Sequence, residues 1–407
     1  MNSRSLLIFL LVIATIFAAT GAYLALTTPK SGTPVHFPLS APLRDLVARV
    51  PASADSFAVV PTAAALQKKL LANPVTRDAV EQWTSEHEIP RAWLFGRADA
   101  VIWREQKRTG YAVRLDTVRA FLFRIFGPAG TWDGDVFISD AGAPMPARDL
   151  DALLAQANGL PKGDVFAVQR DRSRGAFPPI ERPAVTVVSF TPNDIVLTSR
   201  APVAVGRPTT SYDVIRRPTT ARHPRNALLS VTFVEAPRIL DDVDRLLDAK
   251  LSVLVSNGGS IALYDVDAGT LVPRPKGVVA IPADDKARAE MQNIVRVVEL
   301  VGETRDTGPE LLVSFDRRSM PLYLKDAFEP SPWPATRWSL RLDPVRFAPI
   351  LEKLGDNRAL RLLAPRIYRS ARDLRRWTSA LQQAKSIEAA DSVSGGVEEL
   401  RVRIASK

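Results

Sequence analysis

Few residues in the chain could hold a metal ion. Glu86, His87 and Glu88 stand next to one another with Glu81 nearby, and carboxylates with histidine are common zinc ligands. The run ends just before Pro90, however, and is typical of the exposed end of a helix. The chain has no cysteine, and its histidines are His36, His87 and His223. We therefore expect no metal site and no cofactor.

Carboxylates and glycines elsewhere fit structural roles better than catalytic ones. Asp133, Asp135 and Asp140 lack the glycine and closing glutamate of a calcium loop, so we expect a turn around Gly134. The glycine-rich run 256–260 lies between two strand-like segments, which favours a hairpin over a phosphate-binding loop. The chain contains no Walker-type, Gly-x-Ser-x-Gly or Ser-x-x-Lys motif. We therefore assign no catalytic residue.

Residues 6–26 form an uncharged apolar segment. As a helix they would be about 31 Å long, close to the thickness of a bilayer's hydrocarbon core. We expect a single-pass anchor in the inner (cytoplasmic) membrane, contacting the lipid bilayer, with residues 30–407 on the periplasmic or extracytoplasmic side. The alternative is a cleaved signal peptide with a cleavage site at Thr20-Gly21-Ala22.

One six-residue pattern, Arg-Leu-Asp-x-Val-Arg, occurs twice, beginning at residues 114 and 341. Each copy follows an alternating, strand-like run and precedes an apolar helical run. We expect Asp116 and Asp343 to be the N-cap residues of these helices. Gly127 and Gly355 stand where a left-handed C-cap is favoured.

The two halves of the chain also begin and end alike. Looser copies of the strand–helix unit start at Ser56 and Leu229, and hairpins are expected over 184–199 and 387–404. These patterns predict an α+β fold with two related lobes, each a mainly antiparallel sheet with helices packed on one face. The expected segments are the transmembrane anchor 1–27, a proline-rich stalk 28–41, a first lobe 42–200, a linker or extended crossover 201–226 and a second lobe 227–407.

The candidate interaction surface is a basic amphipathic helix expected over residues 365–383. Apolar residues gather on one side of it and arginines on the other. The arginines on and near it are Arg361, Arg369, Arg372, Arg375 and Arg376. Such a helix could bind anionic lipid or an acidic partner, or it could pack on its own sheet with a solvated arginine face.

Trp333 is the tryptophan we single out, because it lies in a proline-stiffened loop. It is either a buried plug of that loop or an exposed contact residue. Most of the other tryptophans, including Trp377, fall inside strand or helix patterns that favour core positions.

Residues 98–111 and the helix after them resemble uncharacterised bacterial envelope proteins. Members of those families have an N-terminal anchor and repeated strand–strand–helix lobes, and some are encoded beside bacterial alpha-2-macroglobulins. The resemblance implies an envelope location and no particular activity.

The net charge of +10 favours anionic partners such as lipid, an envelope polymer or another envelope protein. Nucleic acid is not expected, because an anchor would place the chain on the other side of the membrane. We therefore predict a membrane-anchored envelope protein with a non-enzymatic binding or assembly role. The alternative is an envelope hydrolase that uses carboxylates in a cleft between the lobes.

Overall fold

The computed structural model describes residues 34–86, 99–105, 108–140, 142–170, 184–202, 221–233, 258–268, 273–285, 287–289, 291, 302–314, 316–335, 337–357, 359, 361, 368, 371–372, 375 and 377–407. The chain packs into two compact units. Unit 1 comprises Met1–Pro192 and Thr198–Pro202, and unit 2 comprises Asn193–Leu197 and Val203–Lys407.

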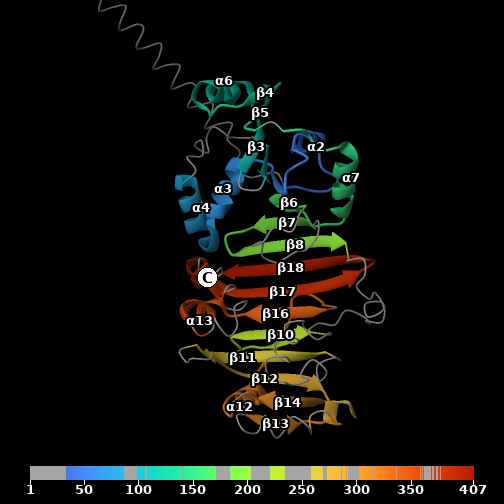
Figure 1. Cartoon of the computed structure of the whole chain (residues 1–407), viewed down its shortest axis with the longest axis vertical. Helices are drawn as coiled ribbons and strands as arrows, with labels where there is room; N and C mark the ends of the chain where they lie inside the picture. Colours follow the sequence, from blue (N-terminus) through green and yellow to red (C-terminus); the bar gives the residue numbers. More distant parts are fainter. Residues whose placement is uncertain are drawn as a thin grey trace, which may run out of the picture. The chain divides into compact units, whose positions relative to one another are not determined.

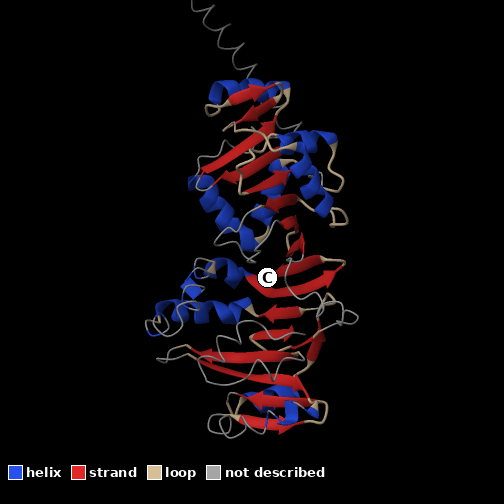
Figure 2. Cartoon of the chain, turned by 45° about the vertical axis from the view of Figure 1, so that its right-hand side comes forward, coloured by secondary structure: helices blue, strands red, loops and turns tan. Residues whose placement is uncertain are grey.

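Strands outnumber helices among the described elements (Figures 1 and 2). The elements up to β8, which belongs partly to unit 2, are α2 (Ala41–Ala48), β1 (Ser56–Val60), α3 (Ala63–Ala72), α4 (Pro74–Glu86), β2 (Ala100–Glu105), β3 (Arg108–Arg114), α6 (Thr117–Phe126), β4 (Thr131–Asp133), β5 (Val136–Ile138), α7 (Ala147–Gln156), β6 (Val165–Gln169), β7 (Ala184–Phe190) and β8 (Asp194–Pro202). The elements after β8 are β9 (Arg222–Pro224), β10 (Leu229–Phe233), β11 (Gly259–Asp267), β12 (Arg274–Pro282), β13 (Glu303–Asp306), β14 (Glu310–Ser314), α12 (Ser319–Lys325), β15 (Phe328–Pro330), β16 (Trp338–Leu342), α13 (Pro344–Asp356), α16 (Thr378–Gln383), β17 (Ala384–Ser394) and β18 (Val397–Ser406).

The predicted α+β class, with a separate sheet and helical layer in each lobe, is wrong. One 16-stranded sheet runs in the order β13-β14-β12-β11-β10-β16-β17-β18-β8-β7-β6-β1-β2-β3-β5-β4, and β9 pairs with β15 in a second, two-stranded sheet. The physical reason lies in the hairpins predicted at the two lobe ends, because an outer strand leaves a row of unpaired backbone groups. Here the outer strands of the two hairpins pair with each other, because β18 lies next to β8 in the sheet. The Ser406 N–H donates to the Asn193 carbonyl at 2.7 Å.

Each half of the sheet has the same strand order. Outward from β8 the order is β8-β7-β6-β1-β2-β3-β5-β4, and outward from β18 it is β18-β17-β16-β10-β11-β12-β14-β13. The two hairpins and the looser copies at β1 and β10 therefore occupy equivalent positions. The two copies of Arg-Leu-Asp-x-Val-Arg do not, because the first follows β3 and the second follows β16.

The expected membrane anchor is also corrected. None of the described helices combines the length and the apolar character needed to cross a bilayer. The segment 6–26 itself lies outside the described residues, as do residues 28–33 of the stalk, whereas Val35 of the stalk is buried in the core of unit 1. The structure thus does not support a single-pass inner-membrane protein with a signal anchor.

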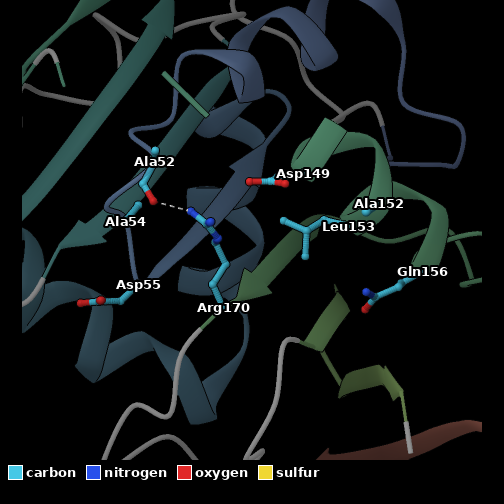
Figure 3. A pocket seen from close by; sticks show the side chains of 8 residues that line it. All are labelled: Ala52, Ala54, Asp55, Asp149, Ala152, Leu153, Gln156 and Arg170. Carbon is cyan, nitrogen blue, oxygen red and sulfur yellow. Dashed lines mark hydrogen bonds between the residues drawn. The ribbon is translucent and has the colours of Figure 1, made fainter. Parts of the chain in front are cut away.

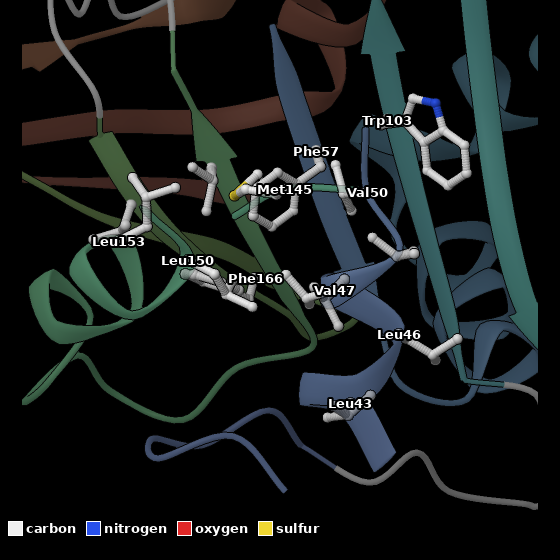
Figure 4. Packing of buried hydrophobic residues seen from close by; sticks show 14 of the residues in the cluster. Leu43, Leu46, Val47, Val50, Phe57, Trp103, Met145, Leu150, Leu153 and Phe166 are labelled. Carbon is white, nitrogen blue, oxygen red and sulfur yellow. The ribbon is translucent and has the colours of Figure 1, made fainter. Parts of the chain in front are cut away.

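The largest apolar core of unit 1 lies where α2 and α7 cover the sheet (Figure 4). Leu46 and Val47 of α2 and Leu150 of α7 pack with strand residues such as Phe57 and Phe166. Buried and partly buried residues alternate along most of β1 and all of β6, so one face of each strand is directed at these helices.

The predicted N-caps are confirmed. The Asp116 carboxylate accepts a hydrogen bond from the Arg119 N–H at 3.0 Å, and Asp343 accepts one from the Arg346 N–H at 3.1 Å. The predicted left-handed C-caps are wrong. Gly127 has a φ of −84°, and Gly355 lies inside α13, which ends one residue later. An N-cap depends on nearby atoms, whereas the helix end depends on what the following residues pack against.

The predicted hairpins are confirmed in β7–β8 and β17–β18. Gly395 and Gly396 have φ values of 56° and 74° in the tight turn of the second hairpin, where side chains would strain the backbone. The predicted turn at Gly134 (φ 62°) is confirmed between β4 and β5.

Candidate functional site

The described arginines of the predicted interaction surface follow α13 in unit 2 and are exposed. They are Arg361, Arg372 and Arg375, whereas Arg369 and Arg376 lie outside the described residues. Arg375 Nη1 donates to Asp356 Oδ1 at 2.6 Å. A Cβ on Gly355 would lie 3.6 Å from Arg375 Cδ and 3.9 Å from Arg372 Cα. Both arginines thus lie against the C-terminal end of α13, where helix carbonyls favour cations.

The sequence placed Trp377 in a core, but its side chain is 50% exposed. The expected helix 365–383 is interrupted there, because Trp377 is a turn residue and α16 begins at Thr378. Thr378 Oγ1 donates to the Arg375 carbonyl at 2.6 Å, and such a side-chain bond competes with the helical backbone bonds. We call Arg361, Arg372, Arg375 and Trp377 the basic-aromatic surface.

Trp333 lies apart from these arginines in the sequence, in the loop between β15 and β16. Its ring is half-buried, and its backbone N–H points to Ser331 Oγ at 3.4 Å. It is thus neither fully buried nor fully exposed.

A cavity of about 450 Å³ lies in unit 1 between α7, the segment before β1 and the end of β6 (Figure 3). Its lining residues are Ala52, Ala54, Asp55, Asp149, Ala152, Leu153, Gln156 and Arg170. Four of them come from one face of α7, with the spacing i, i+3, i+4 and i+7. The sequence showed no sign of this cavity, because residues 52–55 of its wall are more than 90 residues away from the other lining residues, which lie in 149–170.

The cavity contains polar groups with unused hydrogen-bonding capacity. Arg170 Nη1 donates to the Ala52 carbonyl at 2.7 Å. The buried Gln156 Oε1 accepts no hydrogen bond from any described residue. Figure 3 shows Gln156 and Leu153 projecting from α7 toward Arg170, while Asp55 points away from them.

His223 joins a buried polar cluster in unit 2 that the sequence did not indicate. Its Nδ1 and Nε2 lie 2.9 Å from Ser230 Oγ and Ser339 Oγ, respectively, and Ser339 Oγ donates to Ser331 Oγ at 3.2 Å. Burial, and secondly the charge of Arg341, lower the pKa of His223 to about 4. A serine beside histidine could suggest a nucleophile and base. All of these side chains are buried, however, so a substrate cannot reach them and the cluster is structural.

The other carboxylates considered in the sequence have structural partners. Asp133 Oδ2 accepts from Arg49 Nη2 at 2.7 Å, and Asp135 Oδ2 lies 3.1 Å from Arg114 Nε. Among the described residues, no group of three histidine, cysteine or acidic side chains is placed to hold a metal ion. His87 and Glu88 lie outside that part of the chain.

The outer face of α6 carries two exposed apolar side chains. Phe121 is 61% and Ile125 is 55% exposed, one helical turn apart. On the opposite face, Phe123 packs among Phe137 and Trp132. An exposed pair of this size is an informative departure from the usual surface.

No protein-family model, curated protein or solved structure matches this chain. The resemblance to envelope proteins and the alternative of a hydrolase thus stay predictions.

Proposed function

We propose that the chain is a non-catalytic binding protein whose basic-aromatic surface recognises an acidic surface of another protein. The observation that carries the proposal is the exposure of Trp377, which follows the exposed Arg372 and Arg375 closely in the sequence. Tryptophan and arginine are enriched among the residues that contribute most to protein–protein binding. A tryptophan with half its surface in water gains free energy when a partner covers it.

Charge supports an acidic partner. Arg361 and Arg372 are exposed, and the whole chain has a net charge of +10. A planar guanidinium group can bind a carboxylate through two parallel hydrogen bonds, and opposite charges also accelerate encounter. Arg375 contributes less, because Asp356 already pairs with it.

The test uses the full chain and a fluorescein-labelled poly-L-glutamate peptide, with fluorescence anisotropy as the readout. Arg372→Glu should weaken binding at least about 10-fold, and Trp377→Ala by a similar factor. Binding should also weaken steeply as salt rises, because exposed charges are screened.

Arg318→Glu is the matched control, because Arg318 is exposed elsewhere on unit 2 and the change in net charge is the same. It should leave binding nearly unchanged. Equal losses in Arg372→Glu and Arg318→Glu would show that only the net charge acts, which contradicts the proposal. Binding to phosphatidylglycerol vesicles without binding to the peptide would contradict it too.

A further inference from the structure

We propose that Asn158 is a site of spontaneous deamidation, in which the backbone nitrogen of Gly159 attacks the side-chain amide of Asn158 and Arg200 assists. Asn158 and Gly159 lie in an exposed turn directly after α7, and Arg200 lies on β8. All three residues belong to unit 1, so the inference is independent of the basic-aromatic surface on unit 2.

The reaction needs water and no other group from outside the chain. The Gly159 nitrogen loses its proton to solvent and, as the nucleophile, forms a bond to Cγ of Asn158. The bond from Cγ to the side-chain nitrogen then breaks, and this nitrogen takes up a proton and leaves as ammonia. Water opens the resulting cyclic imide at either of its carbonyls, which gives aspartate or isoaspartate at position 158.

Gly159 leaves the path to the Asn158 amide open. It carries no Cβ that would crowd the attack, and its φ of 80° lies in the left-handed region that glycine adopts readily. Within the part of the chain that the structure describes, its N–H donates no hydrogen bond, so none has to break before the proton leaves. Both residues are exposed, so water can take the proton and later open the ring.

Arg200 distinguishes this turn from a bare Asn-Gly dipeptide. Its Nη1 donates to the backbone carbonyl of Asn158 at 2.5 Å. That carbonyl shares a peptide bond with the Gly159 nitrogen, and its oxygen takes up much of the negative charge when the nitrogen loses its proton. A cationic donor stabilises this anion more than the neutral peptide, so it raises the population of the nucleophile.

The product changes the charge of the turn. A Cβ placed on Gly159 would lie 3.0 Å from Arg200 Nη1, so the guanidinium lies directly against the reacting peptide. Conversion of the neutral amide to a carboxylate places a negative charge near this cation and lowers the net charge of +10 by one. Isoaspartate also lengthens the backbone after α7 by one carbon atom.

The test incubates the full chain in heavy-oxygen water at neutral and at mildly alkaline pH, with mass spectrometry of its peptides as the readout. Asn158 should exchange its amide nitrogen for a labelled oxygen atom. The rate should be higher at alkaline pH, because more of the Gly159 nitrogen is then deprotonated. Asn257 and Gly258 form the other Asn-Gly pair of the chain, and the rate at Asn257 is the internal reference.

Three variants assign the role of Arg200. Arg200→Gln should slow the reaction at Asn158 at least about 5-fold and leave the rate at Asn257 unchanged. Arg200→Lys keeps a cationic donor and should retain most of the rate. Arg170→Gln is the matched control, because Arg170 also donates through Nη1 to a backbone carbonyl in unit 1, that of Ala52. It should leave both rates unchanged.

Circular dichroism establishes that each variant is folded. Absence of labelled oxygen at Asn158 in the wild-type chain would overturn the inference. An equal or higher rate at Asn158 in folded Arg200→Gln would overturn it too, because the contact of Arg200 would then only hold the turn in place.

Discussion

The two helices that follow Arg-Leu-Asp-x-Val-Arg, α6 and α13, start alike and differ in what covers them. Five residues after its cap, α6 has Phe121, which is 61% exposed, whereas α13 has Ala348, which is 0% exposed. Phe123 and Ile350, two residues further on, are buried in both helices. α13 packs against α16 and β17, while Phe121 of α6 faces solvent. The motif thus specifies the buried face of each helix, and the neighbouring elements determine whether the opposite face is buried or exposed.

The second arginine of each copy also has a different role. Arg119 is 1% exposed and pairs with its own cap residue, Asp116. Burial raises the pKa of Asp116, but the hydrogen bonds from Arg119 outweigh burial, so the pKa lies below its ordinary value. Arg346 instead donates to the carbonyls of Asn226 and Tyr264 at 2.8 and 2.6 Å. The same side chain therefore reinforces a cap in one copy and joins distant segments in the other.

The largest expected effect separates the two faces of α6. Phe123→Ala should lower the free energy of unfolding by about 3–5 kcal/mol, because it empties a packed aromatic core. Phe121→Ala should change it by less than about 0.5 kcal/mol, because the ring is mostly in water. Urea unfolding of both variants measures the difference. Equal losses would mean that the outer face of α6 is covered in solution.

Acid should weaken the region of the second copy, where Arg341 lies near His223. The pKa of His223 is lowered from 6.5 to about 4, so the folded chain favours the neutral form. Above pH 6.5 the histidine is neutral in both the folded and the unfolded chain, so the folded state keeps its full stability. As the pH falls from 6.5 toward 4, the unfolded chain binds a proton that the folded chain does not, and the free energy of unfolding falls by about 3 kcal/mol.

Unfolding of wild type and His223→Gln between pH 7 and pH 4 tests this acid sensitivity. The free energy of unfolding of the variant should depend less on pH across that range than that of the wild type. The same slope in both proteins would exclude His223 as its source.

The two caps should differ in strength. Asp343→Ala should cost about 1 kcal/mol, the ordinary value of an N-cap. Asp116→Ala should cost about 2–3 kcal/mol, because it also removes an ion-pair partner of the buried Arg119.

Asparagine variants separate the cap from the charge, since asparagine caps as well as aspartate does. Asp343→Asn should be nearly neutral, and Asp116→Asn should still destabilise the chain in thermal unfolding. Neutral behaviour of both would show that the Arg119 pair contributes nothing to stability.

The last prediction exchanges a residue between the copies. Ala348→Phe places the α6 residue at the covered position of α13 and should cost about 1–3 kcal/mol, because the site has no room for a ring. The melting temperature of this variant, compared with that of Val345→Phe on the exposed part of the same helix, measures the crowding. An unchanged melting temperature would show that the residues packed on α13 can move to make room for a ring.

The local features of this protein were determined by its sequence. Asp116 and Asp343 cap their helices, Gly134 forms a turn, and the hairpin at Gly395-Gly396 has the expected position, because each depends on atoms a few residues apart. The repeated motif, in contrast, suggested that its two copies occupy equivalent positions in the two lobes, yet they follow non-equivalent strands of two halves that share one strand order. Sequence similarity over six residues reports local geometry and not position in a sheet.

The tertiary structure alone decided which residues meet. His223 contacts Ser339, which lies 116 residues away, and Arg170 meets the Ala52 carbonyl across 118 residues. Trp377 is exposed at the start of α16, and Phe121 is exposed because nothing described covers it. Contacts between distant segments depend on how the whole chain packs, and neither hydrophobic periodicity nor capping patterns carry that information.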